Sequence, residues 1–562
     1  MIKRKFYLHY LILLGIILVG AFLRFWNLDS KALWMDEVIT AIFSLGKNYR
    51  DLPLDRVLPL TNLAEIFSYQ PQKSCSEIAA NLASQSTHPP LFFCTMYTWL
   101  GWLQPLGDDW IAKLRFLPAL FGVAVIFVIY WVNRIAFSRQ AGLAAAACMA
   151  VSPFAVYLSQ EGRHYTLPML LISMALLLLL QIQQDIFRSQ TRIWVWCSWT
   201  VVNSVSLYVH YFSILALIAQ IGTLALLLIW QKAKIHRQTW VALTLSVIGI
   251  AVSFFPWLMI MLHHSKRSET GWLEAPKHIA PLYQTLINWV LMVIALPVEQ
   301  QSKLNAAVGA VLMLFCGVWV VREVFKGLKQ LLLKLETRLP TLTLLSFSGW
   351  VVLEFFTIIY LTQKDITVVP RYNFVYYPAF CALLAVSLLE RDKRVRDKGL
   401  VNVLLVGIVS CIFLNLNLVF KKPFQPELVA RNFNQEPKVP VMLVVTYSNY
   451  QDVALGLSFG LALQQLQSKN QIEIAQTNSS PPTHLVFLDK KLNFQAVIEK
   501  LAQLPPQQVP LNLWIVASGL RRRDFPKQIN LASQVDCNQD DKQYYRIGIP
   551  YQLYRCQKSG ID

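Results

Sequence analysis

The stretch YLHYLILLGIILVGAFLRF, residues 7–25, decides the fold class of this chain. It is almost wholly apolar and long enough to cross a hydrocarbon core of about 30 Å as a helix. The chain of 562 residues is 55% hydrophobic and only 15% charged, whereas a soluble protein carries roughly a quarter charged residues. These values predict a polytopic α-helical membrane protein. Ten further apolar runs follow the first, at 112–133, 141–158, 166–184, 193–209, 212–230, 239–261, 304–321, 341–361, 373–390 and 399–419.

Basic residues predict the orientation of the spans, because segments rich in Lys and Arg stay on the cytoplasmic side of a membrane. Two further apolar stretches, 90–106 and 281–298, are short or interrupted. If both are re-entrant or interfacial helices, every basic segment lies on one side. We therefore expect about 11 true spans, or about 13 if both stretches cross, with the N-terminus inside and the C-terminal region outside. The basic segments are the N-terminus, 134–139, 188–192, 232–237, 322–338 and 391–398.

From about residue 421 the composition changes to that of a soluble domain. Apolar segments typical of buried strands alternate there with segments of helical periodicity. This alternation predicts a small α/β domain at 421–562, outside the cytoplasm, after a membrane domain at 1–420. Cys537 and Cys556 can form a disulfide if that side is oxidising. The predicted strands are 439–448, 483–491 and 511–518, and QYYRIGIPYQLYRC at 543–556 is expected to close the sheet as an antiparallel hairpin or edge.

Two adjacent carboxylates, Asp36 and Glu37, stand in LWMDEVIT at 33–40, within the first predicted outer loop at about 26–89. A solvated acidic pair at the start of a loop helix is the ordinary explanation. The alternative is catalytic: one carboxylate acts as a general base on an acceptor hydroxyl that attacks a sugar carbon. Adjacent residues of a helix point about 100° apart, so the second acid would then hold a basic partner or a metal ion.

The remaining polar side chains gather in segments that are predicted on the same outer side. Arginines there either snorkel to lipid phosphate or bind the phosphate of a lipid-linked substrate, since the planar guanidinium matches phosphate oxygens. Histidines either cap helices or help to bind a divalent ion. The residues expected to bind the donor phosphate or the substrate are Arg163, Tyr165, Lys266, Arg267, Arg371 and Tyr372, and those expected to orient other groups or to bind a metal are His88, Glu161, His164 and His210.

Several of these motifs together resemble the membrane glycosyltransferases of the GT-C fold. The resemblance is to the branch that includes protein O-mannosyltransferases and the lipid A aminoarabinose transferase, and it covers about residues 7–420. One motif of that branch often reads SQEARMY, from which Gly162 and His164 depart. The motifs, in this order along the chain, are the acidic pair, HPPLFF at 88–93, RFLPALFG at 115–122, SPFAVYLSQEGRHY at 152–165, VHYF at 209–212 and PRY at 370–372.

The resemblance implies an enzyme that moves a hexosyl or pentosyl group from a polyprenyl-phosphate donor to a lipid, glycan or protein acceptor. It implies inversion at the sugar carbon, on the periplasmic or outer face of the plasma (inner) membrane. Among the residues here, it implies Asp36 as the catalytic base, Glu37 as its neighbour in the motif, and Arg163 and Arg371 as ligands of the donor phosphate. Some members of the branch bind a divalent ion near this site, but its ligands are not shared throughout the branch, so the resemblance allows a divalent metal ion here without requiring one.

Other functions fit parts of the sequence. A polytopic transporter or lipid flippase would place ionisable residues along a path through the membrane, and Glu354 is such a residue within a predicted span. No internal repeat accompanies it. A ligase or polymerase of prenyl-linked sugars, or a non-catalytic scaffold, are further alternatives. The net charge of +19 lies mainly in the short basic segments, so nucleic acid is not an expected partner.

Overall fold

The computed structural model of the chain describes residues 2–230, 237–267, 269, 271–390, 393–473, 481–490, 493–504, 508–532 and 535–558. The chain folds into two compact units. The membrane unit contains the chain up to Leu28, Ser86–Met96 and Ala112–Phe420, and the sheet unit contains Asp29–Gln85, Tyr97–Ile111 and the chain from Lys421 onward. Among the predicted cytoplasmic basic residues, Lys232, Lys234 and Arg391 lie outside the described residues.

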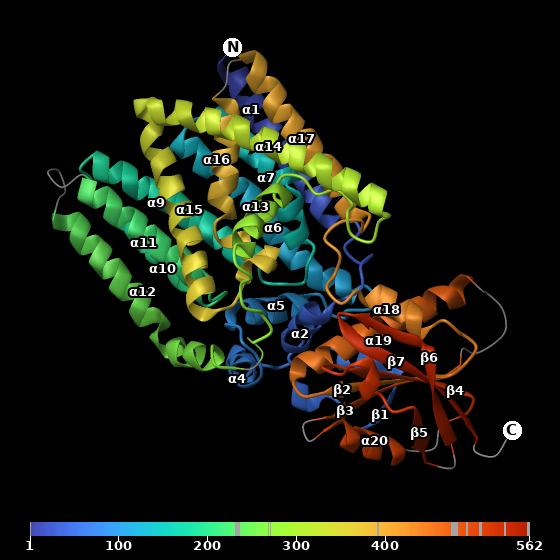
Figure 1. Cartoon of the computed structure of the whole chain (residues 1–562). Helices are drawn as coiled ribbons and strands as arrows, with labels where there is room; N and C mark the ends of the chain where they lie inside the picture. The colour runs from blue at the N-terminus through green and yellow to red at the C-terminus, as the bar shows by residue number, and fades with distance from the viewer. Residues whose placement is uncertain are drawn as a thin grey trace. The chain divides into compact units, whose positions relative to one another are not determined.

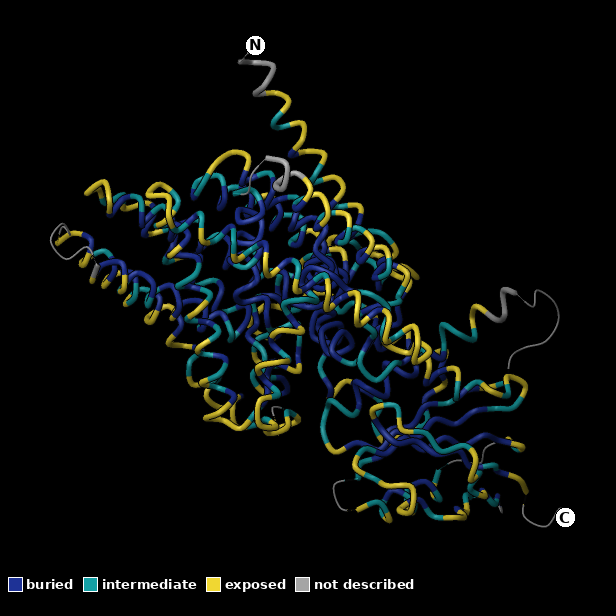
Figure 2. The backbone as a smooth tube through the Cα atoms, turned by 45° about the horizontal axis from the view of Figure 1, so that its top comes forward, coloured by how far each residue is buried: buried dark blue, intermediate teal, exposed yellow. Residues whose placement is uncertain are grey.

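Helices make up the membrane unit, and each predicted apolar run coincides with one helix or, in one case, with a bent pair (Figure 1). Seven of the described helices are long and apolar enough to cross a membrane, or eight if the bent pair is one span. Many large apolar residues of these helices are exposed, as expected of surfaces that face lipid. Figure 2 draws the exposed stretches of the backbone in yellow. The predicted helical membrane class is confirmed, and the number of spans stays a prediction. The helices are α1 (Ile2–Phe25), α6 (Trp110–Ala136), α7 (Arg139–Val151), α8 (Pro153–Ser159), α9 (Thr166–Phe187), α10 (Ile193–Leu207), α11 (Ser213–Trp230), α12 (Arg237–His264), α14 (Lys303–Leu333), α15 (Leu335–Thr362), α16 (Tyr377–Leu389) and α17 (Lys393–Asn415).

The two stretches of uncertain depth, 90–106 and 281–298, each contain one short helix. These are α5 (Leu91–Trp102) and α13 (Ala280–Leu291), with 12 residues apiece. At 1.5 Å per residue each helix is about 18 Å long, well short of a hydrocarbon core of about 30 Å. Their lengths favour the topology in which neither stretch crosses the membrane.

The bent pair α7 and α8 turns by 59° at its break. Pro153 starts α8 and has no N–H to continue the hydrogen bonding of α7. The hydroxyl of Ser152 accepts a hydrogen bond from the Ala155 N–H and donates one to the Met292 carbonyl at 2.8 Å. The break therefore has its own caps, and the short helix α8 that follows it ends at Ser159, the first residue of the SQEGRHY segment.

Buried polar side chains hold the surroundings of this break. Arg24 of α1 is fully buried and donates to the carbonyls of Met149 and Ala150, at 2.8 and 2.9 Å, at the end of α7. Gln160 donates to the Leu23 carbonyl and to the side chain of Asn415. These bonds satisfy polar groups that would otherwise be costly in an apolar interior, and they fix the position from which residues 161–165 start.

A seven-stranded sheet forms the sheet unit, in the order β1-β3-β2-β4-β7-β6-β5 (Figure 1). Its centre, β3-β2-β4, is parallel, and β7, β6 and β5 continue it antiparallel. The predicted strands and closing hairpin are confirmed, but β1 belongs to the first loop and pairs antiparallel with β3, with Val57 opposite Val486. The strands are β1 (Val57–Pro59), β2 (Val441–Tyr447), β3 (Thr483–Asp489), β4 (Leu511–Ala517), β5 (Gln528–Leu531), β6 (Val535–Ile547) and β7 (Ile549–Lys558).

Helices cover both faces of the parallel centre, which explains why β2 and β4 are continuous apolar runs. On one face α20 (Phe494–Ala502) contributes Val497 and Leu501 to the same buried core cluster as Met442 of β2. On the other face α19 (Tyr450–Glu473) comes so close that a Cβ on Gly456 would lie 2.6 Å from the Phe487 ring. A glycine at this point lets the helix backbone approach the sheet.

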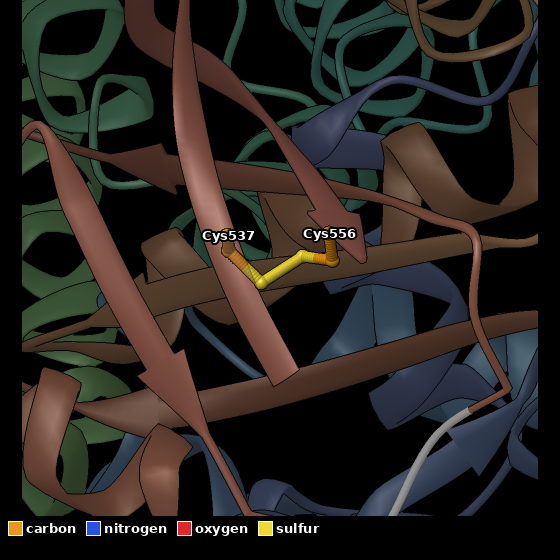
Figure 3. The surroundings of a disulfide bond; sticks show 2 residues. All are labelled: Cys537 and Cys556. Atoms are coloured by element: carbon orange, nitrogen blue, oxygen red, sulfur yellow. A yellow bond between two sulfur atoms is a disulfide. The ribbon is translucent and has the colours of Figure 1, made fainter. Parts of the chain in front are cut away.

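One disulfide joins β6 to β7. Cys537 and Cys556 lie directly opposite each other in the antiparallel pair and are bonded (Figure 3). This confirms the pairing that the sequence allowed.

Candidate active site

The acidic pair lies in the first turn of α2 (Met35–Ser44), in the sheet unit. Asp36 is 9% exposed and Glu37 is fully buried, so neither is a solvated surface acid. The start of a helix favours negative charge because its free N–H groups point outward. The Trp34 N–H points at the Glu37 carboxylate at 3.5 Å, and the Lys422 ammonium lies 3.6 Å from it. Glu37 thus has the basic partner that the sequence left unnamed.

In the membrane unit, three histidines from three separate segments meet. We call His88, His164 and His210 the histidine cluster. The ring centre of His164 lies 5.0 Å from that of His88 and 4.7 Å from that of His210. His88 precedes α5, His164 stands between α8 and α9, and His210 stands between α10 and α11. The structure therefore brings together the HPPLFF, SQEGRHY and VHYF motifs.

Two arginines flank one tyrosine beside the histidine cluster. Arg163, 2% exposed, donates from Nη2 to Nε2 of His88 at 3.1 Å. Arg371, in the short 3-10 helix η5 (Pro370–Val375), donates from Nε to the Tyr165 hydroxyl at 2.9 Å. Their guanidinium carbons lie 5.8 and 5.9 Å from the centre of the Tyr165 ring. We call Arg163, Tyr165 and Arg371 the arginine clamp.

The histidines of the cluster are neutral near pH 7. Burial, and next to it the positive charge of Arg163, lowers the pKa of His88 and His164 well below 6.5. The same causes lower the pKa of His210 to about 3. Both ring nitrogens of His164, a residue 1% exposed, lack a hydrogen-bond partner among the described residues. A buried neutral imidazole without partners keeps one N–H donor and one acceptor nitrogen, and both can bind a ligand.

The other predicted residues occupy different places around this centre. The ring of Tyr372 packs against that of Phe212, with 4.8 Å between the two ring centres. Arg267 donates to the Ser86 carbonyl at 2.8 Å, and the Ser86 hydroxyl bonds to Nδ1 of His88, so Arg267 orders the segment that carries His88. Glu161 is buried two residues before Arg163, and Lys266 is exposed.

Two features of the structure were not predicted from the sequence. A chain of hydrogen bonds runs from the Trp257 indole N–H to the Tyr211 hydroxyl, which shares a hydrogen bond of 2.8 Å with Nδ1 of the buried His264. His264 belongs to a segment that the sequence already marked as polar and outer, so its pattern could have signalled it. Nothing in the sequence pointed to Lys422, which follows the last apolar run.

A metal ion has no ligand set in the part of the chain that the structure describes, since no three His, Cys, Asp or Glu side chains there gather in a way that could hold one. The residues do not fit the divalent ion that the resemblance suggested. The chemistry below therefore uses only side chains.

The fold and the motifs together define a class. The chain is a polytopic membrane protein with the fold of the GT-C glycosyltransferases, which confirms the resemblance seen in the sequence. Residues 88–260 match the family model described as dolichyl-phosphate-mannose-protein mannosyltransferase. That match takes in the histidine cluster and Arg163. No curated protein sequence matches this chain.

Among solved structures, the chain is similar to ArnT from Cupriavidus metallidurans, both bound to undecaprenyl phosphate and in the apo state. Each comparison gives a TM-score of 0.51 and 12% sequence identity, over 97% of both chains. The apo oligosaccharyltransferase of Archaeoglobus fulgidus gives a TM-score of 0.47 and 13% identity, over 81% of this chain and 64% of that chain. At these identities the ArnT likeness shows the fold.

Proposed function

We propose that this protein transfers a sugar, a hexose or a pentose, from a polyprenyl-phosphate donor to an acceptor hydroxyl on the extracytoplasmic face of the plasma membrane. The observation that carries the proposal is the arginine clamp: two guanidinium groups from distant segments each lie within 6 Å of the ring centre of one buried tyrosine. A guanidinium fork matches phosphate oxygens. The ArnT structure with bound undecaprenyl phosphate supports a prenyl phosphate as the ligand.

The arginine clamp can stabilise the prenyl phosphate as the leaving group of the transfer. As the bond between the sugar carbon and the phosphate oxygen breaks, its electron pair goes to the phosphate, and negative charge grows there. Fixed cations stabilise that charge most strongly when they are buried and already in place. Neutral His164, whose ring nitrogens have no hydrogen-bond partner among the described residues, can donate one N–H to the same oxygens without repelling Arg163.

Asp36 supplies the other half of the reaction. Its carboxylate takes the proton of the acceptor hydroxyl while the hydroxyl oxygen attacks the sugar carbon from the face opposite the phosphate. This order of events inverts the configuration at that carbon. The acceptor is a lipid, a glycan or a protein.

The test is transfer by the purified full-length protein with labelled polyprenyl-phosphate sugars. Asp36→Asn is expected to lower kcat by about 10²–10⁴-fold, the usual contribution of a general base. Asp29→Asn changes an exposed acid of the same loop and is expected to keep full turnover. Unchanged transfer in Asp36→Asn would remove this residue as the base.

A wild-type protein without turnover on any prenyl donor would instead favour transport. One observation supports that second candidate. Glu354 lies within α15, and neither of its carboxylate oxygens has a hydrogen-bond partner among the described residues. An ionisable group so placed in a membrane helix often marks a substrate path.

A further inference from the structure

Glu37 and Lys422 form an ion pair inside the sheet unit. The Glu37 side chain is fully buried, the Lys422 side chain is 7% exposed, and their charged atoms are 3.6 Å apart. The Lys422 ammonium also lies 5.9 Å from the centre of the Trp34 ring, a distance at which the face of an indole attracts a cation. Lys422 thus binds both the cap residue of α2 and its third helical residue.

A buried ion pair of this kind contributes little to the free energy of folding. Removing two charges from water is costly, and an apolar pair of similar volume is often as stable or more so. Breaking such a pair by removing one partner is costly, however, because it leaves an isolated buried charge. The pair therefore contributes more to holding one geometry than to stability.

The ion pair fixes the start of α2, because Lys422 contacts Trp34 before Asp36 and Glu37 after it. Side chains of the C-terminal chain hold the preceding residues as well. The Ala32 N–H donates to Glu427 of α18 (Pro426–Phe433) at 3.0 Å, and the Leu33 carbonyl accepts from the Ser458 hydroxyl of α19 at 2.7 Å. Asp36 stands between these anchored residues and Glu37.

We propose that Glu37 and Lys422 are a positioning pair, which fixes the first turn of α2 so that the Asp36 carboxylate is presented in one place. Glu37 then acts through Lys422 and not as a second acid or base. The inference rests on the proposed function, because it gives the position of Asp36 a purpose. It also makes the C-terminal chain a part of the construction of the active site.

The test compares Glu37→Gln, Lys422→Met, the double variant and Lys422→Arg. Misplacing a reacting group by about 1 Å costs on the order of 10²-fold in rate, so we expect each single variant to lose about that much kcat, with the KM for the donor nearly unchanged. Residues that act as one unit give non-additive losses, so the double variant is expected to be no slower than either single one. Lys422→Arg keeps the charge and is expected to restore most of the rate.

Lys500→Met is the matched control. Lys500 pairs with Asp55 at 2.9 Å, so it also links the first loop to the C-terminal chain, but both partners are 43% exposed. We expect this variant to keep wild-type kcat. A normal kcat in Lys422→Met, or a loss in Glu37→Gln that far exceeds that in Lys422→Met and adds to it, would overturn the inference.

Hydrogen exchange separates this inference from the proposed function, because it needs no turnover. Lys422→Met is expected to speed amide exchange in residues 35–40 at least several-fold, while Lys500→Met leaves that segment unchanged. Unchanged exchange in Lys422→Met would refute the positioning role even in an inactive protein. A wild-type protein that transfers no sugar, yet shows this exchange pattern, would refute only the proposed reaction.

Discussion

Arg163 illustrates how one residue is prepared for a phosphate. One N–H of its guanidinium is donated to Nε2 of His88, which fixes the direction of the planar group. His88 can accept that bond only through an unprotonated Nε2, and the low pKa of this histidine provides that state. The neutral histidine thus orients the arginine without cancelling its charge.

Arg163→Lys tests the need for the fork. A lysine keeps the positive charge but has no planar pair of donors. Loss of one charged hydrogen bond is worth about 1.5–3 kcal/mol, so we expect kcat/KM for the donor to fall by roughly 10–100-fold. Steady-state kinetics with varied donor measures this.

Arg192→Lys is the control for that change. Arg192 is 37% exposed and paired with Asp185, at the end of the protein that we predict to be cytoplasmic. Its replacement is expected to leave kcat/KM unchanged. Equal effects of the two substitutions would argue against a phosphate at Arg163.

The histidine cluster predicts a dependence of stability on pH. The pKa values of its members in the folded protein lie below the ordinary histidine value of 6.5, so at lower pH the unfolded chain binds more protons than the folded one. Stability is then complete above about pH 6.5 and falls as the pH drops, by up to about 1.4 kcal/mol per pH unit for each histidine.

Thermal unfolding of the purified protein between pH 7.5 and 4.5 measures this dependence. His164→Met removes one titrating group, so the loss of Tm on acidification is expected to be smaller than in the wild type. His263→Gln changes an exposed histidine of α12 and is expected to keep the wild-type slope. If Tm fell equally with pH in all three proteins, the result would contradict the burial of His164 as a neutral imidazole.

At the scale of elements, the break between α7 and α8 sets the place of the SQEGRHY segment. A close contact with α6 supports it. A Cβ added to Gly122 of α6 would lie 2.1 Å from the hydroxyl oxygen of Ser159, the last residue of α8. The absence of a side chain on Gly122 therefore lets α6 and α8 touch directly before the site begins.

Gly122→Ala is expected to push α8 away, because packed interiors do not absorb an extra methyl group without a shift. We expect a lower Tm and a loss of transfer of at least tenfold. Gly15→Ala is the control, since a Cβ at Gly15 of α1 meets nothing within 4 Å. Wild-type behaviour of Gly122→Ala would show that this contact does not position the site.

At the scale of the whole molecule, the basic segments predict which residues face the cytoplasm. Thr61 of the first loop and Ser189 between α9 and α10 are exposed and lie on opposite predicted sides. A cysteine at position 61 is expected to react with a membrane-impermeant maleimide in intact cells, and one at position 189 only after permeabilisation. Labelling of both from one side would refute the orientation.

Some parts of this structure could be predicted from patterns in the sequence, and others could not. A long apolar run such as 304–321 must become a helix, because lipid cannot hydrogen-bond an open backbone. The strands at 441–447 and 511–517 are buried on both faces and so are visible as apolar runs. In contrast, β1 has three residues and no periodicity, and no local rule pairs Glu37 with Lys422. Contacts between distant segments depend on packing, which a single sequence does not display.

The pairing of β1 with β3 also has a consequence for biosynthesis. Val57 lies opposite Val486, so the partner of β1 emerges from the ribosome about 430 residues later. At about 5–20 residues per second, the first loop waits on the order of half a minute while the intervening helices enter the bilayer. The first loop, which bears Asp36, is therefore among the first segments made, yet its strand β1 cannot pair until β3 has been synthesised.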